Sequence, residues 1–323
     1  MNIMQDKVRS RFFIFIGVIV LFLTGAHYLR TQKQLKEQKD AKIYCTTYPI
    51  YLFTKAITAH TIGPQAELLL PANTGCPHDY AITPTDLMKL SGNKVLLLTN
   101  GLGLDDAIAK AALRANPSLI VADTTAGFRP IVSGKQSCSH KEKGCKHDHD
   151  HGNGANPHMF ASPDMASGMV ENITAVIEKL SPANKEKYRK NAASLIFALK
   201  NLEKEIKETD FKQKNIAVQH DVFAYLARLA GLNQAVTLDA ETAKAPSPAR
   251  VAELKKQIKD QKIAVIFSEP QYPADLPKLL AKECGIKHAV LDPVASGPAD
   301  ADASYYVKTM RNNLAVLKEH LCK

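Results

Sequence analysis

The sequence predicts an α/β protein of two lobes, each with a mainly parallel sheet, joined by one long rigid helix. Three observations lead to this fold class. Short apolar, β-branched runs alternate with helical stretches from residue 43 onward, a long run without Gly or Pro interrupts the alternation at residues 183–210, and the alternation then resumes. The length of 323 residues suits about two domains, and 45% hydrophobic with 23% charged residues is typical of globular proteins.

The N-terminal lobe is expected over residues 43–181. Its strands are expected at Ile43–Thr47, Ala66–Leu70, Val95–Thr99 and Leu119–Asp123. Its helices are expected at Pro49–Ala59, Pro84–Leu90, Asp105–Arg114 and Pro163–Leu180. Because strands and helices alternate, consecutive strands should be parallel, with helices on the faces of the sheet. Ser162 and Pro163 suit the N-cap and the first position of the last helix.

Residues 182–211 are expected to form the linking helix. The run Ala183–Asp210 lacks Gly and Pro and places apolar residues at helical spacing under a charged outer face. These apolar residues are Tyr188, Ala192, Leu195, Leu199, Leu202 and Ile206. A long amphipathic helix between two α/β segments indicates a rigid connection between the lobes, and the alternative is one more core helix.

The C-terminal lobe is expected over residues 212–323. Its strands are expected at Ile216–His220, Ala235–Leu238, Ala264–Ser268 and His288–Leu291. Its helices are expected at Val222–Leu229, Pro248–Gln261, Pro273–Cys284 and Asp302–Leu321. A ligand cleft between two such lobes would lie beyond the carboxyl ends of the strands.

The N-terminal segment 1–26 is typical of a secretory signal peptide. Three basic residues precede the apolar run Phe12–Leu23, and the small residues Thr24-Gly25-Ala26 follow it. The apolar stretch is shorter than the roughly 20 residues that a membrane-spanning helix prefers, so cleavage after Ala26 is favoured over permanent anchoring. Residues 27–42 form a polar linker that would serve as a tether if the segment stays uncut. The mature protein is therefore expected in the periplasm or an equivalent extracytoplasmic space.

The net charge of +10 does not indicate nucleic-acid binding. Residues 1–40 hold seven Lys/Arg against three Asp/Glu, and the other basic residues are scattered through Lys-rich helices such as 182–214 and 250–262. Since no basic stripe is interleaved with aromatic residues, the charge is interpreted as solvated helix surface.

The six cysteines can form disulfides, because an exported protein folds in an oxidising compartment. Cys284 and Cys322 belong to the last elements of the chain and are expected to pair. Cys138 and Cys145 bracket His140 in a His-rich loop, where they could pair or hold metal. The spacing of the cysteines assigns no partner to Cys45 or Cys76.

The His-rich loop, residues 133–155, has almost no apolar residue to pack. Its histidines are His140, His147, His149 and His151, interleaved with Asp148 and Asp150. Imidazole and carboxylate groups at this density indicate a weak, exchangeable metal-collecting loop. The alternative is a merely polar surface loop.

Five other residues follow predicted strands or precede predicted helices: His78, His158, His220, Glu269 and Asp292. An α/β protein places ligand-contacting groups at such positions. Taken singly, each residue could be a helix cap, a turn residue or a surface side chain. Three histidines and a carboxylate on both sides of the linking helix together predict a metal site in the interlobe cleft.

Several motifs resemble the zinc-uptake (ZnuA-like) branch of the cluster A-I, or cluster 9, metal-binding proteins of ABC transporters. The resemblance extends from about residue 43 to the end of the chain. The motifs are TTYPIY, GCPHDYAITPTDLMKL, TNGLGLDD, NPHMFASP, QHDVFAYLARLAGL, FSEPQY and LDPVASG, with the His-rich insert before NPH. The resemblance implies two α/β lobes joined by a single long helix, with metal held between them.

The resemblance further implies His78, His158, His220 and Asp292 as metal ligands. Glu269 matches a carboxylate beside that site or an alternate ligand. This chain departs from the pattern at Cys76, which could add a thiolate. Independently of the family, imidazole donors suit zinc, and three His with one carboxylate make a compact tetrahedral set.

The expected function is extracytoplasmic capture of Zn²⁺ and its delivery to the membrane permease of an ABC importer with a cytoplasmic ATPase. The protein would act as a monomer, without catalysis, and would touch the membrane only through an uncleaved N-terminal segment. One alternative is a manganese- or iron-binding protein of the same family, against which His220 argues. Another is a periplasmic zinc buffer without a transporter. A zinc hydrolase is disfavoured because HExxH is missing from the sequence and Asp292 would close the coordination.

Overall fold

The computed structural model describes residues 24–25, 41–77, 80–132, 154–239 and 246–322. Within these ranges no helix is both long and apolar enough to cross a membrane. Several predicted features lie wholly or mostly outside these ranges. They are the segment 1–26, the linker 27–42, His78, and the His-rich loop with His140, His147, His149 and His151.

The N-terminal sheet has the strand order β2-β1-β3-β4, and every neighbouring pair is parallel. Its strands are β1 (Lys42–Cys45), β2 (Ala66–Leu68), β3 (Val95–Thr99) and β4 (Ile120–Asp123). The helices of this half are α2 (Tyr48–Thr58), α3 (Pro84–Lys89), α4 (Asp106–Ala115) and α5 (Pro163–Leu180), with a short 3₁₀ turn η2 (Met159–Ala161) before α5. The register aligns Ile43 with both Ala66 and Leu96.

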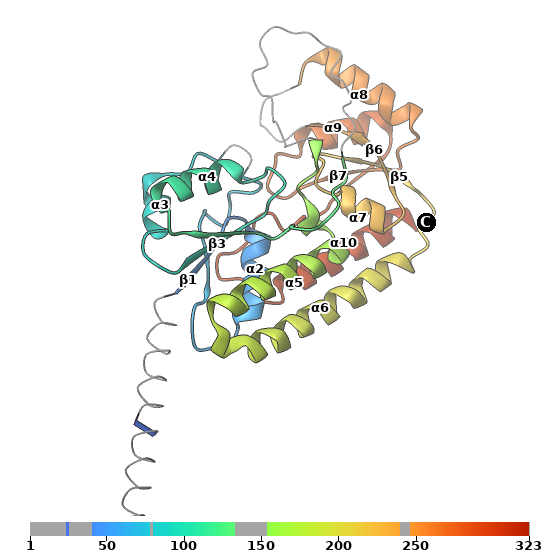
Figure 1. Cartoon of the computed structure of the whole chain (residues 1–323). Coiled ribbons are helices and arrows are strands. Elements are labelled where there is room, and N and C mark those ends of the chain that lie inside the picture. Colours follow the sequence, from blue (N-terminus) through green and yellow to red (C-terminus); the bar gives the residue numbers. More distant parts are fainter. Residues whose placement is uncertain (1–23, 26–40, 78–79, 133–153, 240–245, 323) are drawn as a thin grey trace, which may run out of the picture.

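The C-terminal sheet repeats this arrangement with the order β6-β5-β7-β8, again all parallel. Its strands are β5 (Asn215–Val218), β6 (Asn233–Thr237), β7 (Val265–Ser268) and β8 (Lys287–Val290). Its helices are α7 (Ala224–Leu229), α8 (Pro248–Asp260), α9 (Asp275–Cys284) and α10 (Tyr305–Leu321). The predicted fold of two parallel-sheet α/β lobes is therefore confirmed (Figure 1).

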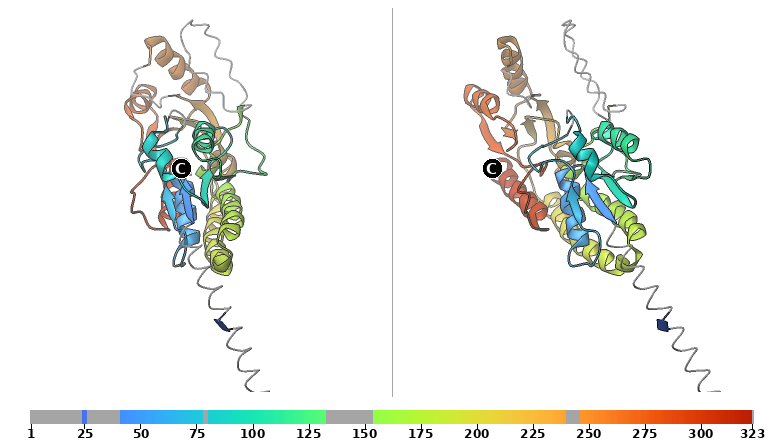
Figure 2. Two further views of the ribbon diagram at one scale, coloured as in Figure 1. Left: turned by 60° about the vertical axis from the view of Figure 1, so that its left-hand side comes forward. Right: turned by 90° about the vertical axis from the view of Figure 1, so that its left-hand side faces the viewer.

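Successive side chains of a strand point to opposite faces of the sheet, and the two faces of each sheet pack into different hydrophobic cores. In β1, Ile43 and Cys45 join a large central core, whereas Tyr44 joins a second core under α3 and α4. In β5, Val218 faces the central core, whereas Ala217 packs under α8 and α9. The central core is continuous between the halves and includes α2, α5, α6 and α10, which gather along one side of the molecule (Figures 1 and 2).

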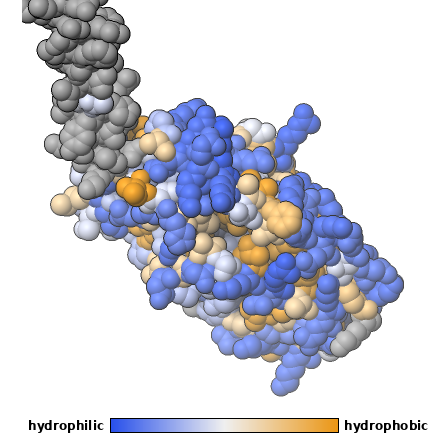
Figure 3. Space-filling model, turned by 90° about the horizontal axis from the view of Figure 1, so that it is seen from below, coloured by the Kyte–Doolittle hydropathy of each residue, from blue (hydrophilic) through white to orange (hydrophobic). Residues whose placement is uncertain are grey.

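The helix α6 (Lys185–Lys207) connects the two halves after a 3₁₀ turn η3 (Pro182–Asn184). Its buried side chains are the six that periodicity predicted: Tyr188, Ala192, Leu195, Leu199, Leu202 and Ile206. They join the central core, and α6 contacts α2, α5, α7 and α10. On the outer face, Glu203 pairs with Lys200 at 3.1 Å and with Lys207 at 2.6 Å. The lower side of the molecule, toward which α6 lies in Figure 1, is mostly hydrophilic (Figure 3).

The predicted disulfide between Cys284 and Cys322 is wrong, because both thiols are free. Cys284 ends α9 and packs against the core under α8 and α9. Cys322 follows α10 and packs against the central core on the opposite face of the C-terminal sheet. The sheet lies between these two cores, and a disulfide needs Cα atoms within about 7 Å of each other. Both cysteines are near the end of the chain, but this does not reveal on which face of the sheet each one lies.

Candidate metal centre

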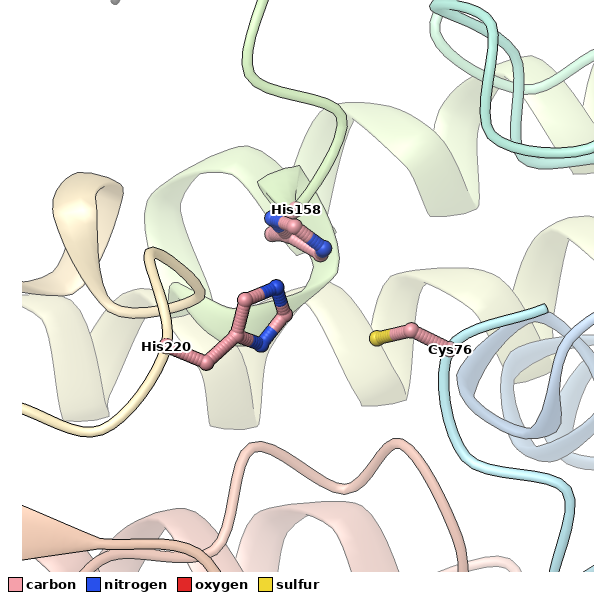
Figure 4. Close-up of side chains that lie close together, drawn as sticks. All are labelled: Cys76, His158 and His220. Carbon is pink, nitrogen blue, oxygen red and sulfur yellow. The ribbon is translucent and has the colours of Figure 1, made fainter. Parts of the chain in front are cut away.

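Three side chains from separate parts of the chain meet in one cluster: Cys76, His158 and His220 (Figure 4). One sulfur or nitrogen atom from each lies within 4.8 Å of the corresponding atoms of the others. His158 and His220 are buried, with 3% and 5% of their surface exposed, and Cys76 is half-buried. The two imidazole rings meet edge to face, with centroids 4.6 Å apart. Buried imidazole and thiol groups at this separation form a donor set of the kind that binds transition metals.

His158 is oriented by Asn156, two residues earlier. The Asn156 Nδ2 group donates to the backbone oxygen and to Oδ2 of Asp221, at 2.8 and 3.1 Å, which fixes Oδ1 as the acceptor. That oxygen lies 3.1 Å from His158 Nδ1, so Nδ1 must carry the proton. The His158 Nε2 atom is left with its lone pair, which is the form of imidazole that binds a metal.

His220 follows β5, where the backbone N–H of Gln219 extends the sheet by donating to Phe267 O at 2.9 Å. In the order β6-β5-β7-β8, the connections after β5 and β7 diverge, and ligands bind at such a switch point. Glu269 follows β7 at that point, and its Oε1 lies 3.5 Å from His220 Nδ1. A carboxylate beside Nδ1 favours the Nδ1–H tautomer and makes Nε2 a better metal ligand.

Glu269 is itself held firmly. Only 1% of its surface is exposed, and its Oε2 accepts a hydrogen bond from Gln271 Nε2 at 2.6 Å. Its backbone N–H donates to Gln219 Oε1 at 3.2 Å, and the Gln219 amide donates onward to Pro273 O. The carboxylate therefore lies beside a histidine of the cluster, as the sequence suggested.

Cys76 lies in the loop after β2. The backbone of this loop turns at Pro71, whose oxygen accepts a hydrogen bond from Thr74 N at 3.0 Å. Gly297 N donates to Ala72 O at 3.1 Å and so ties the loop to the segment between β8 and α10. Gly75 has φ of +73°, a conformation that favours glycine, and a Cβ there would come within 3.7 Å of Gln271. The loop thus brings the thiol against the C-terminal half.

A second network holds the loops after β1 and β3. The Asp105 carboxylate accepts hydrogen bonds from Thr46 Oγ1 at 2.5 Å, from Asn100 N at 2.6 Å and from Gly101 N at 3.0 Å. Burial raises the pKa of Asp105 to about 6, even though these hydrogen bonds act in the opposite direction. Asn100 Nδ2 donates to Pro157 O at 2.9 Å, directly before His158. The TNGLGLDD motif therefore helps to position the histidine.

The structure does not bring Asp292 into the group around Cys76, among the residues that it describes. Its Oδ1 accepts a hydrogen bond from Val294 N at 2.7 Å, and its backbone N and O both bond to the Asn313 amide. Burial raises the pKa of this carboxyl group. His78 and the four histidines of the His-rich loop lie outside the described residues.

The supporting residues Asn156, Asn100 and Asp105 were not identified from the sequence. Asn156 directly precedes the PH dipeptide, and Asn100 and Asp105 lie within the TNGLGLDD motif. Their roles depend on hydrogen bonds between segments up to 65 residues apart, which spacing does not reveal.

Comparison with known proteins identifies relatives along almost the whole chain. Zinc-binding protein AdcA of Streptococcus pyogenes is 31% identical over 96% of this chain, and the chain spans 61% of that protein's length. High-affinity zinc uptake system protein ZnuA of Bacillus subtilis is 30% identical over 95% of this chain and 97% of its own. The crystal structure of the Zn(II)-bound ZnuA-like domain of Streptococcus pneumoniae AdcA superposes with a TM-score of 0.70 at 28% identity, covering 88% of this chain and all of that one.

The family model described as "Zinc-uptake complex component A periplasmic" matches residues 43–320. This range begins in β1 and ends in α10, so it contains both sheets and the cluster between them. The chain therefore belongs to the ZnuA family, as its motifs predicted.

Proposed function

We propose that this protein captures Zn²⁺ outside the cytoplasm and delivers it to the membrane permease of an ABC importer. The observation that supports this function best is the pair of buried imidazoles, His158 and His220, with each Nδ1 beside an oxygen acceptor. That arrangement prepares both Nε2 atoms to bind a metal, and nitrogen donors suit zinc. The family membership and the printed names of the AdcA and ZnuA relatives support zinc as the cargo.

His158 and His220 are the proposed histidine ligands within the described residues, and the PHDY motif adds His78. Glu269 orients His220. In a zinc hydrolase the same carboxylate would instead have to activate a water molecule. Since the chain spans 61% of the S. pyogenes relative, the proposed activity concerns the part that the two chains share. The segment 1–26 would export the protein, and the His-rich loop would collect zinc loosely and raise its local concentration.

Release of the metal would require the permease to separate the donors. The long helix α6 packs against helices of both halves, so wide closure or opening around a hinge is disfavoured. We infer that a small relative movement or a loop shift changes the coordination. The loaded form would then differ from the empty form mainly near the cluster, and the permease would recognise that difference.

A manganese- or iron-binding function is the second candidate. Manganese prefers carboxylate and carbonyl oxygens, whereas the described cluster offers two imidazoles and a thiol. The donor set therefore favours zinc over manganese.

The test is metal content and competitive zinc titration of the purified protein and of His220→Ala. His320→Ala is the matched control, because His320 is a half-buried histidine of α10 outside the cluster. We expect one tightly bound zinc, weakened by about 100-fold or more in His220→Ala and unchanged in the control. Equal zinc affinity in both variants, or preferential retention of manganese that does not depend on His220, would overturn the proposal.

A further inference from the structure

The thiol of Cys76 is the third donor of the cluster, and the family resemblance assigned it no role. We propose that Cys76 binds the metal as a thiolate beside His158 and His220. The centre would then be a mixed imidazole–thiolate site in place of the imidazole–carboxylate site that the motifs suggested. This inference rests on the proposed function, because it concerns the ligands of the same captured ion.

The separations in the cluster can be compared with those of a tetrahedral zinc site. With Zn–S of about 2.3 Å and Zn–N of about 2.0–2.1 Å, sulfur and nitrogen ligands lie about 3.6 Å apart. The sulfur and the two imidazole nitrogens all lie within 4.8 Å of one another. Each sulfur–nitrogen separation therefore exceeds the ligand spacing of a zinc site by at most about 1.2 Å, a gap that side-chain rotation can close. In Figure 4 the sulfur of Cys76 points toward the His220 ring.

Contacts across the molecule hold the thiol at this position. The Gly297 N to Ala72 O hydrogen bond anchors the loop four residues before Cys76. Gly75 lies against Gln271, and Gln271 bonds to the Glu269 carboxylate that orients His220. The loop carrying the sulfur and the segment carrying Glu269 therefore share one contact region at the cluster.

Asp292 competes poorly for the same coordination position. One of its carboxylate oxygens accepts a hydrogen bond from Val294 N within its own turn, at 2.7 Å. Its backbone N and O are both fixed by Asn313 of α10, so the residue has little freedom to approach the histidines. Cys76 already lies within the 4.8 Å group, whereas Asp292 lies outside it and its backbone is tied to α10.

Thiolate coordination would narrow the range of metals. As the metal–sulfur bond forms, the thiol loses its proton to solvent, and the thiolate brings one negative charge to the divalent ion. Thiolate is a soft ligand that favours zinc over manganese and magnesium. Cys76 would thus add to the preference for zinc over manganese and magnesium that the two imidazoles provide.

The test uses Co²⁺ as a spectroscopic substitute for zinc. All proteins carry Cys138→Ser and Cys145→Ser, because thiols in the His-rich loop could also bind cobalt. Cobalt spectra are recorded for three proteins: this double variant, the double variant with Cys76→Ser, and the double variant with Cys284→Ser. The third protein is the control, because Cys284 is a half-buried thiol outside the cluster. We expect a sulfur-to-cobalt charge-transfer band in the near ultraviolet that disappears with Cys76→Ser and persists with Cys284→Ser.

A second measurement needs no change at Cys76. Peptide mapping after alkylation should show that zinc slows the labelling of Cys76 by about tenfold or more, while labelling of Cys284 and Cys322 is unchanged. Tight cobalt binding that depends on His220 but gives no sulfur band, with no protection of Cys76, would overturn the thiolate inference and leave zinc capture standing. Failure to bind cobalt or zinc at all would overturn both.

Discussion

The carboxylate of Glu269 should control zinc affinity without supplying a metal–oxygen bond. Its Oε1 lies 3.5 Å from His220 Nδ1, and Gln271 and the burial of the side chain fix its position. Glu269→Gln keeps the size of the side chain but removes the charge that favours the Nδ1–H tautomer and strengthens Nε2 as a ligand. Loss of such a partner typically weakens metal binding by 10- to 100-fold, or about 1.4–2.7 kcal/mol.

Competitive titration of the purified protein with a zinc chelator measures this change. The melting temperature of the metal-free protein should stay the same or rise, because the substitution removes a charge that is costly to bury. Glu203→Gln is the control, since Glu203 is a partly buried carboxylate on the outer face of α6 that pairs with Lys200 and Lys207 and lies outside the cluster. Zinc affinity of Glu269→Gln equal to that of the wild type would refute the assigned role. A large fall in melting temperature together with affinity would indicate structural damage instead.

Three further predictions concern stability and the His-rich loop. Burial alone would raise the pKa of Asp86, but hydrogen bonds from Thr83, Lys89 and Tyr80 lower it to about 2, so this carboxylate stabilises the fold above pH 4 and loses that effect as the pH falls toward 2. Asp86→Ala should therefore lower the free energy of unfolding by about 1 kcal/mol at pH 7. Chemical denaturation of the wild type and the variant at pH 7 and pH 2 should show a smaller difference between the two proteins at pH 2. Burial raises the pKa of Asp105 to about 6, so the free energy of unfolding should increase by about 2 kcal/mol as the pH falls from 6 to 4. Asp105→Asn should flatten this dependence, and an unchanged pH profile would contradict the origin of the shift. Deletion of Gln136–Gly152 should slow growth at limiting zinc while the tight site keeps its affinity, and unchanged growth would count against a collecting role.

The secondary structure could be predicted because its signals are local. The run without Gly or Pro becomes α6, and the side chains expected to be buried are the buried ones. Pro163–Leu180 matches α5, and the predicted parallel strands recur within a few residues of their observed ends. Local periodicity also places His220 and Glu269 at the ends of predicted strands, whereas their proximity was implied by the family resemblance and follows from the pairing of β5 with β7.

The relations between distant segments could not be predicted in the same way. Cys284 and Cys322 are both near the end of the chain, but the faces of the sheet on which they lie depend on how α9 and α10 pack. The role of Asn156 depends on Asp221, across the whole of α5 and α6. The sequence left Cys76 as one possibility among several, because its distance from the histidines is set by the Gly297–Ala72 contact between the halves.

The different anchoring of the donors suggests an order in which the metal is released. His158 and His220 are buried and held by Asn156 and by the end of β5, so they should move little. Cys76 is half-buried in a loop that the Gly297–Ala72 hydrogen bond ties to the other half. A permease that shifts this loop would break the metal–sulfur bond first and leave a weaker imidazole site. Cys76→Ser should then speed zinc release while weakening affinity less than His220→Ala does. Stopped-flow release into a chelator and equilibrium titration of both variants test this ranking, and equal release rates in Cys76→Ser and wild type would exclude a sulfur-first order.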